Sequence, residues 1–484
     1  MIKYLEDEKI YRLWLKFQTV AICCIFVYFS LFQFAPNYLG ALYSVPYRLC
    51  GLLLIIGFLL IRRFKDGLEF KLFFFYLVWI TVMRIIDGSF FLDGVPDGIF
   101  NRWMSLPLCV FALVIPAEKR LKLMDIMAII YAVAYTLLAF ICIYAGPEQL
   151  TLINPLTGTE LCEFVGGRLH VFWKNSNAVS TWFMLACWML LYLFFRSKKP
   201  VWKIIIVPAI LANYVALALT FSRSAQLGFV LGAGMFAAAL ALKKLPLEKL
   251  WHKAAVFLLC MCICLPVYKG FALSTTFINS LAPESSQSEV VVKTRSAANA
   301  GKIETLSMVQ LDSTAKAPQS EKEKQEDMTD RLNNRGLHST GRTELWYGAI
   351  KTIEDEPSRL ITGKFESIVD TNDYIRKYDR QQFVLYGDRI HHHNAYLEMF
   401  LYSGIPGFAL IMGFLLLLVY KMVKLYFCKK SDMALISLIV MLTGLFIYNL
   451  FESCLLHIYD MRNVTFFILA GYMLAFEKEL CRKY

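Results

Sequence analysis

Three histidines and an asparagine, His391 to Asn394, stand directly before a stretch whose spacing is typical of a helix. Histidine is the side chain best suited to move a proton near neutral pH. The residues alone do not decide which of the three would act, and a solvated cluster at a helix start is the alternative. Gly404 suits the left-handed position that ends a helix, and Pro406 suits the first turn of the next one. The polar cluster thus stands where the chain re-enters an apolar medium.

Arg223 lies between Ser222 and Ser224, where one apolar segment ends and another begins. If either serine caps the second segment, Arg223 occupies a helix N-terminus, where a cation opposes the helix dipole. An anion bound beside Arg223 would reverse the sign of that interaction. Free amides, a hydroxyl and a guanidinium together suit a phosphate. The alternative interpretation is an arginine that extends to the lipid headgroups.

Arg342 opens a segment with helical spacing that Pro357 ends. Arg342 is in line with the apolar face of that helix, which comprises Leu345, Trp346, Ala349, Ile350 and Ile353. A guanidinium that faces inward favours a carboxylate or a phosphate as its partner, so a salt bridge to a nearby acid is the alternative to a substrate phosphate. Two further arginines, Arg84 and Arg168, fall near the ends of apolar segments or in the loops beside them.

Apolar runs are the elements that must position these side chains. The 484 residues are 57% hydrophobic and 18% charged, with a mean hydropathy of +0.51, whereas soluble domains carry about a quarter charged residues. A bilayer requires roughly 20 apolar residues per helix. The candidate runs are roughly 17–34, 41–61, 70–87, 102–117, 121–145, 175–195, 201–221, 224–242, 251–270, 405–427, 432–452 and 462–477. The sequence therefore predicts an all-α polytopic membrane protein with about 12 transmembrane helices.

The net charge of +12 is distributed unevenly along the chain. Lysine and arginine collect in alternate loops, and the loop after the third apolar run instead carries Asp87, Asp93 and Asp97. Because cytoplasmic loops hold the excess of basic residues, both termini are predicted to be cytoplasmic, and the arginines and histidines above to be extracytoplasmic. The positive charge is thus a topology signal, and we predict no nucleic-acid partner.

The 13 cysteines lie mostly inside the apolar runs, and no CxxC pair with metal spacing occurs. We interpret them as small buried hydrophobic residues. Because no acidic pair flanks a plausible metal site either, we predict neither a metal nor another cofactor.

Three regions follow from this pattern. Residues 1–270 hold the first nine transmembrane helices, 271–390 form a large extracytoplasmic loop, and 391–484 hold the last three helices. Within the loop, 284–335 is rich in Ser, Lys, Glu and Gln and is predicted to be disordered. Residues 340–390 are predicted to be helical and to form part of the site.

Four segments resemble, in this order, the O-antigen ligase and O-antigen polymerase superfamily. They are GRLHVFWKNSNAVSTWF at 167–183, TFSRSAQLG, GRTELWYGAI followed by a glycine turn, and HNAYLEMFLYSGIPG. The similarity covers about 165–410, and the twelve-helix layout extends it to the whole chain. The chain departs from the family pattern in its insertion at 284–335 and in its extra histidines, His391 and His392.

The resemblance implies a GT-C-like fold and a metal-independent glycosyltransferase in a bacterial inner membrane. Its donor would be a glycan on a polyprenyl diphosphate, and its acceptor a glycan or a lipid. By motif, Arg223 and Arg342 would hold the donor diphosphate and His393 would activate the acceptor hydroxyl. Further substrate contacts are expected from Arg168, Arg84 and Asn394.

The sequence leaves several functions open. A polymerase would join repeat units of a capsule or exopolysaccharide, and a ligase would transfer a finished chain, as in lipopolysaccharide assembly. A transporter or flippase of lipid-linked glycans is the alternative from another class, although such proteins usually show repeated halves with broken helices at the midplane. A structural or sensor membrane protein would leave the set of arginines and histidine unexplained.

Overall fold

The computed structural model describes residues 8–31, 48–57, 67–91, 95–148, 150–153, 160–165, 168–172, 176–245, 250–280, 342–364, 371, 373–374, 392–455 and 461–480. Its main helices are α1 (Glu8–Leu31), α3 (Leu68–Ile86), α4 (Val95–Val114), α5 (Ala117–Ala145), α6 (Ser176–Arg196), α7 (Pro200–Leu219), α8 (Arg223–Lys244), α9 (Leu250–Ser280), α11 (Arg342–Asp355), α12 (Arg359–Thr362), α15 (Ala395–Tyr426), α16 (Met433–Tyr448) and α17 (Met461–Leu480). Three short strands, β1 (Leu152–Ile153), β2 (Glu160–Val165) and β3 (Arg168–Val171), complete the fold.

Every apolar run predicted from the sequence overlaps a helix within these residues. Within the described ranges, seven helices are long and apolar enough to cross a membrane by length and composition: α1, α5, α6, α7, α8, α9 and α15. Shorter apolar helices are Arg48–Gly57, Gly98–Val114 and Met433–Tyr448. The prediction of a largely α-helical, multi-pass membrane protein is confirmed in this coarse form, while the number of spans and the GT-C-like arrangement stay predictions.

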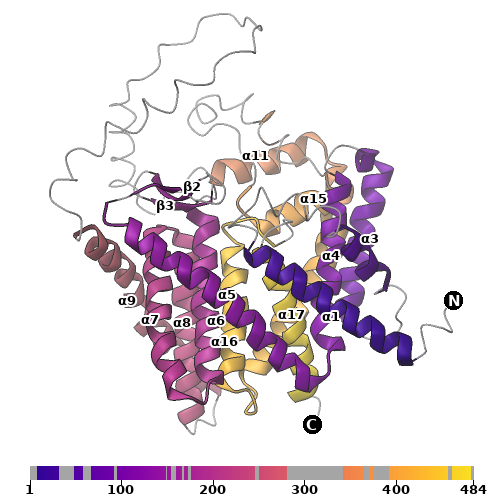
Figure 1. The fold of residues 1–484 in the computed structure, drawn as a ribbon. Coiled ribbons are helices and arrows are strands. Elements are labelled where there is room, and N and C mark those ends of the chain that lie inside the picture. Colours follow the sequence, from indigo (N-terminus) through magenta and orange to yellow (C-terminus); the bar gives the residue numbers. More distant parts are fainter. Residues whose placement is uncertain are drawn as a thin grey trace, which may run out of the picture.

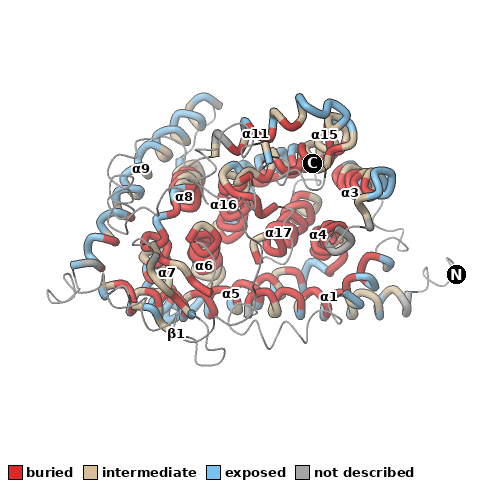
Figure 2. Tube along the Cα trace, turned by 90° about the horizontal axis from the view of Figure 1, so that it is seen from above, coloured by how far each residue is buried: buried red, intermediate tan, exposed pale blue. Residues whose placement is uncertain are grey.

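The helices form a bundle with a buried centre (Figures 1 and 2). Seen from above, α4, α6, α16 and α17 stand nearly end-on and are mostly buried, whereas α9 and α3 lie at the periphery and expose more surface. Helix α16 packs on α6 and α8, and α17 packs on α4 and α15. A Cβ added to Gly228 of α8 would lie 3.1 Å from the carbonyl oxygen of Gly444 in α16, so small residues permit the close approach of these two helices.

Helix α15 contains a sharp kink at Gly404, where φ is +64° and ψ is −175°. The predicted break at this glycine is thus confirmed, although helix continues on both sides of it. The segment after α12 packs against the kink, because the amide of Lys364 donates to the carbonyl oxygen of Leu401 at 2.7 Å. Gly363 also adopts a positive φ, +65°, and its α-carbon faces the backbone of Tyr402.

A small antiparallel sheet was not expected from the sequence. Strand β2 pairs with β1 on one side and with β3 on the other, with Cys162 opposite both Leu152 and Val171. The sheet lies at the same end of the molecule as α11 and the start of α15 (Figure 1). We call this end, with the sheet, α11 and the first turn of α15, the site end.

Helix α11 begins at Arg342 and ends at Asp355, as the pattern before Pro357 predicted. Leu345 and Ala349 are buried, but Ile350, predicted on the same face, is 49% exposed and that assignment was wrong. The insertion at 284–335 lies outside the described residues, as do 340–341, 365–370, 372 and 375–390. Helix α9 continues to Ser280, past the predicted start of the loop at 271, and the domain boundaries stay predictions.

Candidate functional site

The carboxylate of Glu452, in the turn after α16, joins three polar side chains from distant parts of the chain. Its Oε1 atom accepts hydrogen bonds from the Arg342 guanidinium at 2.7 Å and from the Asn177 amide at 2.7 Å. Its Oε2 atom lies 3.0 Å from Nδ1 of His393. The starts of α6, α11 and α15 are therefore held together by one acidic side chain, and two of the predicted catalytic residues, Arg342 and His393, share it.

Arg168 extends this cluster through Asn177. The Arg168 guanidinium donates to Oδ1 of Asn177 at 3.0 Å and, through Nε, to the carbonyl oxygen of Thr220 at 3.2 Å. Because Arg168 is the first residue of β3 and Thr220 follows α7, the arginine links the sheet to the turn that leads into α8. The chain of contacts from Thr220 to His393 spans five segments, and we call it the Glu452 cluster.

Glu452 is buried, yet it is held as a carboxylate. Burial alone would raise the pKa of this group. The hydrogen bond and charge of His393, together with the nearby guanidinium groups of Arg342 and Arg462, outweigh burial and lower the pKa below its ordinary value of 4.5. An ionised carboxylate can only accept hydrogen bonds, so Nδ1 of His393 carries the proton that faces it. Whenever the ring is neutral, Nε2 is therefore its unprotonated nitrogen.

Strained backbone surrounds this cluster. Among the described residues, the non-glycine residues with positive φ are Phe172, Phe221 and His393, with φ values of 47°, 50° and 53°. Phe172 follows the strand of Arg168, and Phe221 stands between Thr220 and the start of α8. Left-handed conformations of bulky residues are unfavourable and gather at functional sites, where the surrounding structure imposes them.

Arg223 is the first residue of α8 and is exposed. No hydrogen bond or ion pair joins it to another part of the chain that the structure describes, and nothing here brings it into direct contact with the Glu452 cluster. Ser222 is the N-cap residue, but its hydroxyl does not cap the helix and instead lies 3.3 Å from the hydroxyl of Ser224. The predicted serine cap is thus absent, which leaves the amides of the first turn open to another acceptor.

His392 and His393 have different surroundings. His392 is fully buried: its Nε2 lies 2.9 Å from the Thr371 hydroxyl, and its backbone amide donates to Glu398 at 2.9 Å. Its carbonyl oxygen accepts a hydrogen bond from the Trp346 indole at 2.8 Å. His393 is partly exposed beside Glu452. Only the second of these rings has a surface that a substrate could reach, and His391 lies outside the described residues.

Asn394 and Arg84 occupy structural positions. Asn394 is the N-cap of α15, and its Oδ1 accepts from the amides of Tyr396 and Leu397, both at 3.0 Å. Arg84 is 2% exposed, forms an ion pair with Asp87 at 3.0 Å and donates to the carbonyl oxygen of Thr362 at 2.8 Å. Among the residues that the structure describes, no contact joins Arg84 to the Glu452 cluster, and the substrate-binding roles of both residues stay predictions.

Comparison with protein families identifies part of the chain. Residues 208–412 match the family model described as O-antigen ligase. This segment is similar to O-antigen ligases. The resemblance read from the sequence motifs is confirmed over this segment, and no curated protein matches the chain.

The segment that matches the O-antigen ligase family contains Arg223, Arg342 and His393, whereas Arg168 and Glu452 lie outside it. The cluster that contains two of the predicted catalytic residues therefore depends on segments both before and after the matched region. The family is one of membrane proteins that act in polysaccharide biosynthesis, which agrees with the apolar helices found here.

Sequence analysis missed Glu452 and Asn177. Glu452 is the last residue of the apolar run at 432–452. An acid in that position was the available signal, since Arg342 already required a carboxylate or a phosphate. The structure shows that the carboxylate is present. Asn177 gave no such signal, because an asparagine at a helix start is most often only a cap.

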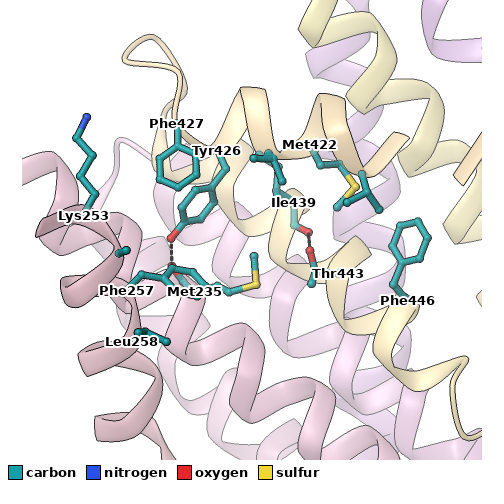
Figure 3. Close-up of a pocket in the computed structure, with 13 residues that line it drawn as sticks. Met235, Lys253, Phe257, Leu258, Met422, Tyr426, Phe427, Ile439, Thr443 and Phe446 are labelled. Carbon is teal, nitrogen blue, oxygen red and sulfur yellow. Dashed lines mark hydrogen bonds between the residues drawn. The ribbon is translucent and has the colours of Figure 1, made fainter. Parts of the chain in front are cut away.

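An apolar groove of about 580 Å³ lies between α8, α9, α15 and α16 (Figure 3). Lys253 and Phe427 stand at one end, and Phe446 stands at the other. The carbonyl oxygen of Phe446 accepts a hydrogen bond from the Tyr396 hydroxyl at 3.0 Å, so this end of the groove contacts the first turn of α15. An apolar hollow of this kind suits a hydrocarbon chain.

Proposed function

We propose that this protein is a glycosyltransferase that moves a glycan from a polyprenyl diphosphate to an acceptor hydroxyl at the extracytoplasmic face of a bacterial inner membrane. The observation that carries the proposal is the pairing of His393 with Glu452 inside a cluster of arginines. The match to the O-antigen ligase family supports the class of reaction.

His393 acts as the general base. Its Nε2 atom takes the proton of the acceptor hydroxyl while the acceptor oxygen bonds to the anomeric carbon of the donor sugar, and the bond from that carbon to the diphosphate breaks. Glu452 fixes the tautomer through Nδ1 and stabilises the imidazolium that forms. Base assistance of this kind contributes about 10²–10⁴ in rate. Asn394, whose amide nitrogen is not used in capping α15, contacts the substrate.

The arginines neutralise the donor diphosphate. A diphosphate is a good leaving group, so the protein must chiefly stabilise the departing charge and orient the acceptor. Arg223 offers its guanidinium beside the first-turn amides of α8, and Arg342 offers the donors that Glu452 does not occupy. Arg168 adds its positive charge from β3. Arg84 supports the same substrate from α3. We expect transfer to persist in the presence of a metal chelator, because arginines perform the neutralisation.

The apolar groove supports a lipid-linked donor. Its end at Phe446 contacts Tyr396, in the same turn of chain that follows His393 and Asn394. A polyprenyl chain that lies in the groove would lead its diphosphate toward the site end of the bundle. The other members of the proposed reaction, a glycan or lipid acceptor and the surrounding membrane lipids, approach from the same end.

The decisive experiment is glycan electrophoresis of a deletion strain complemented with the wild-type gene or with His393→Ala. A polymerase gives short surface glycans in the deletion strain, whereas a ligase gives full-length chains that remain on the lipid carrier. Whichever of these phenotypes the deletion strain shows, complementation with His393→Ala at a normal protein level should leave it unchanged. Accumulation of lipid-linked glycan at the cytoplasmic face would instead indicate a transporter, and an unchanged glycan pattern would contradict glycan assembly altogether.

The side of the membrane has its own test. A phosphatase reporter fused at Ala282 should be active, and one fused at Leu245 should be inactive, because the basic loops predict the cytoplasmic side for the second position. The reverse pattern would place the Glu452 cluster on the cytoplasmic side. It would contradict the proposal that transfer to the acceptor takes place at the extracytoplasmic face.

A further inference from the structure

Two cysteines meet where the sheet joins α5. The chain turns back directly after α5, since the amide of Leu150 donates to the carbonyl oxygen of Ala145 at 2.9 Å. Two residues later, Leu152 pairs with Cys162 across β1 and β2. Cys162 is thereby placed over the last turn of α5, and Cys142 lies in that turn.

The two thiols are in direct contact and shielded from solvent. Cys142 and Cys162 are both fully buried, and a side-chain hydrogen bond joins them. That bond lowers the pKa of the Cys162 thiol from its ordinary value of 9.0, although burial acts in the opposite direction. Two other buried cysteines have oxygen partners instead: Cys187 donates to the carbonyl oxygen of Ile210, and Cys454 donates to the side chain of Asn449.

We propose that Cys142 and Cys162 form a disulfide bond in the mature protein. The sheet lies at the site end, which the proposed function places on the extracytoplasmic side, and disulfides form and persist in that compartment of bacteria. The two thiols give up two protons and two electrons as the S–S bond forms. The electrons pass to a disulfide of an extracytoplasmic oxidoreductase, which is reduced to its dithiol. Oxidation occurs before the sheet packs onto α5, because the finished fold buries both sulfur atoms.

The bond would fasten the strand that carries Arg168. Strand β2 pairs with β3 in a register that sets Val165 opposite Arg168, so a covalent link from Cys162 to α5 restrains the hairpin at its base. Arg168 in turn contacts Asn177 and Thr220. The disulfide is thus a positioning device for the Glu452 cluster, in a chain whose cysteines otherwise resemble ordinary core residues.

Peptide mass spectrometry tests this inference on the full-length protein. Cells are quenched in acid, membranes are denatured, and free thiols are alkylated without reductant. Trypsin then releases residues 123–168, which contain these two cysteines and no others. We expect that peptide to carry no alkyl group until a reductant is added, and two afterwards. After cleavage at Glu148 and Glu160, the fragment with Cys142 and the fragment with Cys162 should separate only after reduction.

Cys109 provides the matched control, because it is equally buried and has no thiol partner among the described residues. It should be alkylated without reductant. In Cys162→Ala, Cys142 should likewise become alkylated without reductant. Full alkylation of the wild-type peptide before reduction would overturn the disulfide. That result would leave the glycan-transfer proposal standing if the phosphatase reporters place the site end outside, so the two failures are distinguishable.

Discussion

Nδ1 of His393 lies 3.0 Å from Oε2 of Glu452, although the two residues are far apart in the sequence. The contact decides which ring nitrogen holds the proton and which is free for an acceptor. It also places a buried negative charge beside the imidazolium that proton transfer would create. A single hydrogen bond therefore orients the ring of His393 and stabilises its imidazolium form electrostatically.

The first prediction concerns Glu452→Gln. The amide is close in shape to the carboxylate but can present an N–H to Nδ1, which favours the wrong tautomer of His393. We expect transfer to fall by about 10²–10⁴, the range of general-base assistance. Arg342 also loses its anionic partner, which should cost about 1–3 kcal/mol in the free energy of unfolding. A transfer assay and thermal unfolding measure the two effects.

Glu354→Gln is the control for Glu452. Glu354 belongs to α11 and is largely exposed, so its ion pair with Lys351 should contribute little to stability. This variant should transfer glycan normally. Equal activities of Glu452→Gln and Glu354→Gln would show that the carboxylate of Glu452 has no part in the reaction.

Neighbouring histidines should give opposite phenotypes. His393→Ala should abolish transfer and retain the fold, since the ring is partly exposed and bonds only Glu452 among the described residues. His392→Ala removes the partner of the Thr371 hydroxyl in a buried position, which should cost about 1–3 kcal/mol of stability. Activity per folded molecule should survive in that variant. An inactive but stable His392→Ala protein would assign the base to the other ring.

Substitution of Arg223 should weaken donor binding and have little effect on folding. In Arg223→Lys the charge remains but the fork that grips two oxygens is lost, so most activity should disappear. Arg223→Gln should leave the empty protein as stable or up to about 1 kcal/mol more stable, because a charge opposed to the helix dipole is removed. Thermal unfolding with and without polyprenyl diphosphate donor measures both states.

Arg295→Ala, in the insertion at 284–335, is the charge control for Arg223 and should change neither activity nor stability. If the donor stabilises Arg223→Gln as much as the wild type, Arg223 is not the phosphate ligand. The ligand would then be sought at Arg342, Arg168 or Arg84.

The lowered pKa of Glu452 predicts a dependence of stability on pH. A carboxyl whose pKa is lower in the folded state stabilises the protein at pH values above the unfolded pKa, here near 4.5. That contribution is lost as pH falls below 4.5 and through the lowered folded value. The difference in Tm between wild type and Glu452→Gln should therefore be fully present near pH 5 and shrink as the pH falls below 4.5. A difference that grows on acidification would reverse the assigned direction.

Two facing glycines should be intolerant of a side chain. A Cβ at Gly404 would lie 2.3 Å from the carbonyl oxygen of Ile361, and one at Gly363 would lie 2.4 Å from the carbonyl carbon of Tyr402. Alanine at either position combines this clash with a left-handed φ, which alone costs about 1–2 kcal/mol. We expect each variant to lower Tm clearly.

Gly88→Ala separates the two contributions, because Gly88 has a φ of +74° and nothing lies within 4 Å of its added Cβ. It should show the conformational cost alone. Gly413→Ala, in α15 with an ordinary φ and a flexible Leu72 neighbour at 3.1 Å, should be nearly neutral. Equal losses at Gly88 and Gly404 would indicate that the contact with α12 contributes nothing.

The helices could be predicted because length and apolar composition suffice to specify them. The same holds for the break at Gly404, where only one residue type adopts the required φ without strain. Arg342 was also informative, since a cation on an apolar face requires an anionic partner, and the structure supplies one in Glu452.

Other features have no periodic signal. The strands of the sheet are only two to six residues long, too short for an alternating pattern to stand out. Glu452 and Asn177 acquire their importance from tertiary contacts between segments far apart in the sequence. The distinction between His392 and His393 likewise depends on the left-handed backbone conformation of His393. No neighbouring residue type predicts that conformation.

The order of synthesis gives Glu452 a further significance. Domains and their elements emerge from the ribosome in sequence, N-terminal parts first. Asn177, Arg342 and His393 are therefore all translated before the residue that joins them. A nascent chain that has inserted every earlier helix still lacks the anion that orients the histidine. Catalytic competence should consequently arise late in biogenesis, after α16 has been made, so that incomplete chains in the membrane remain inert toward the lipid-linked glycans around them.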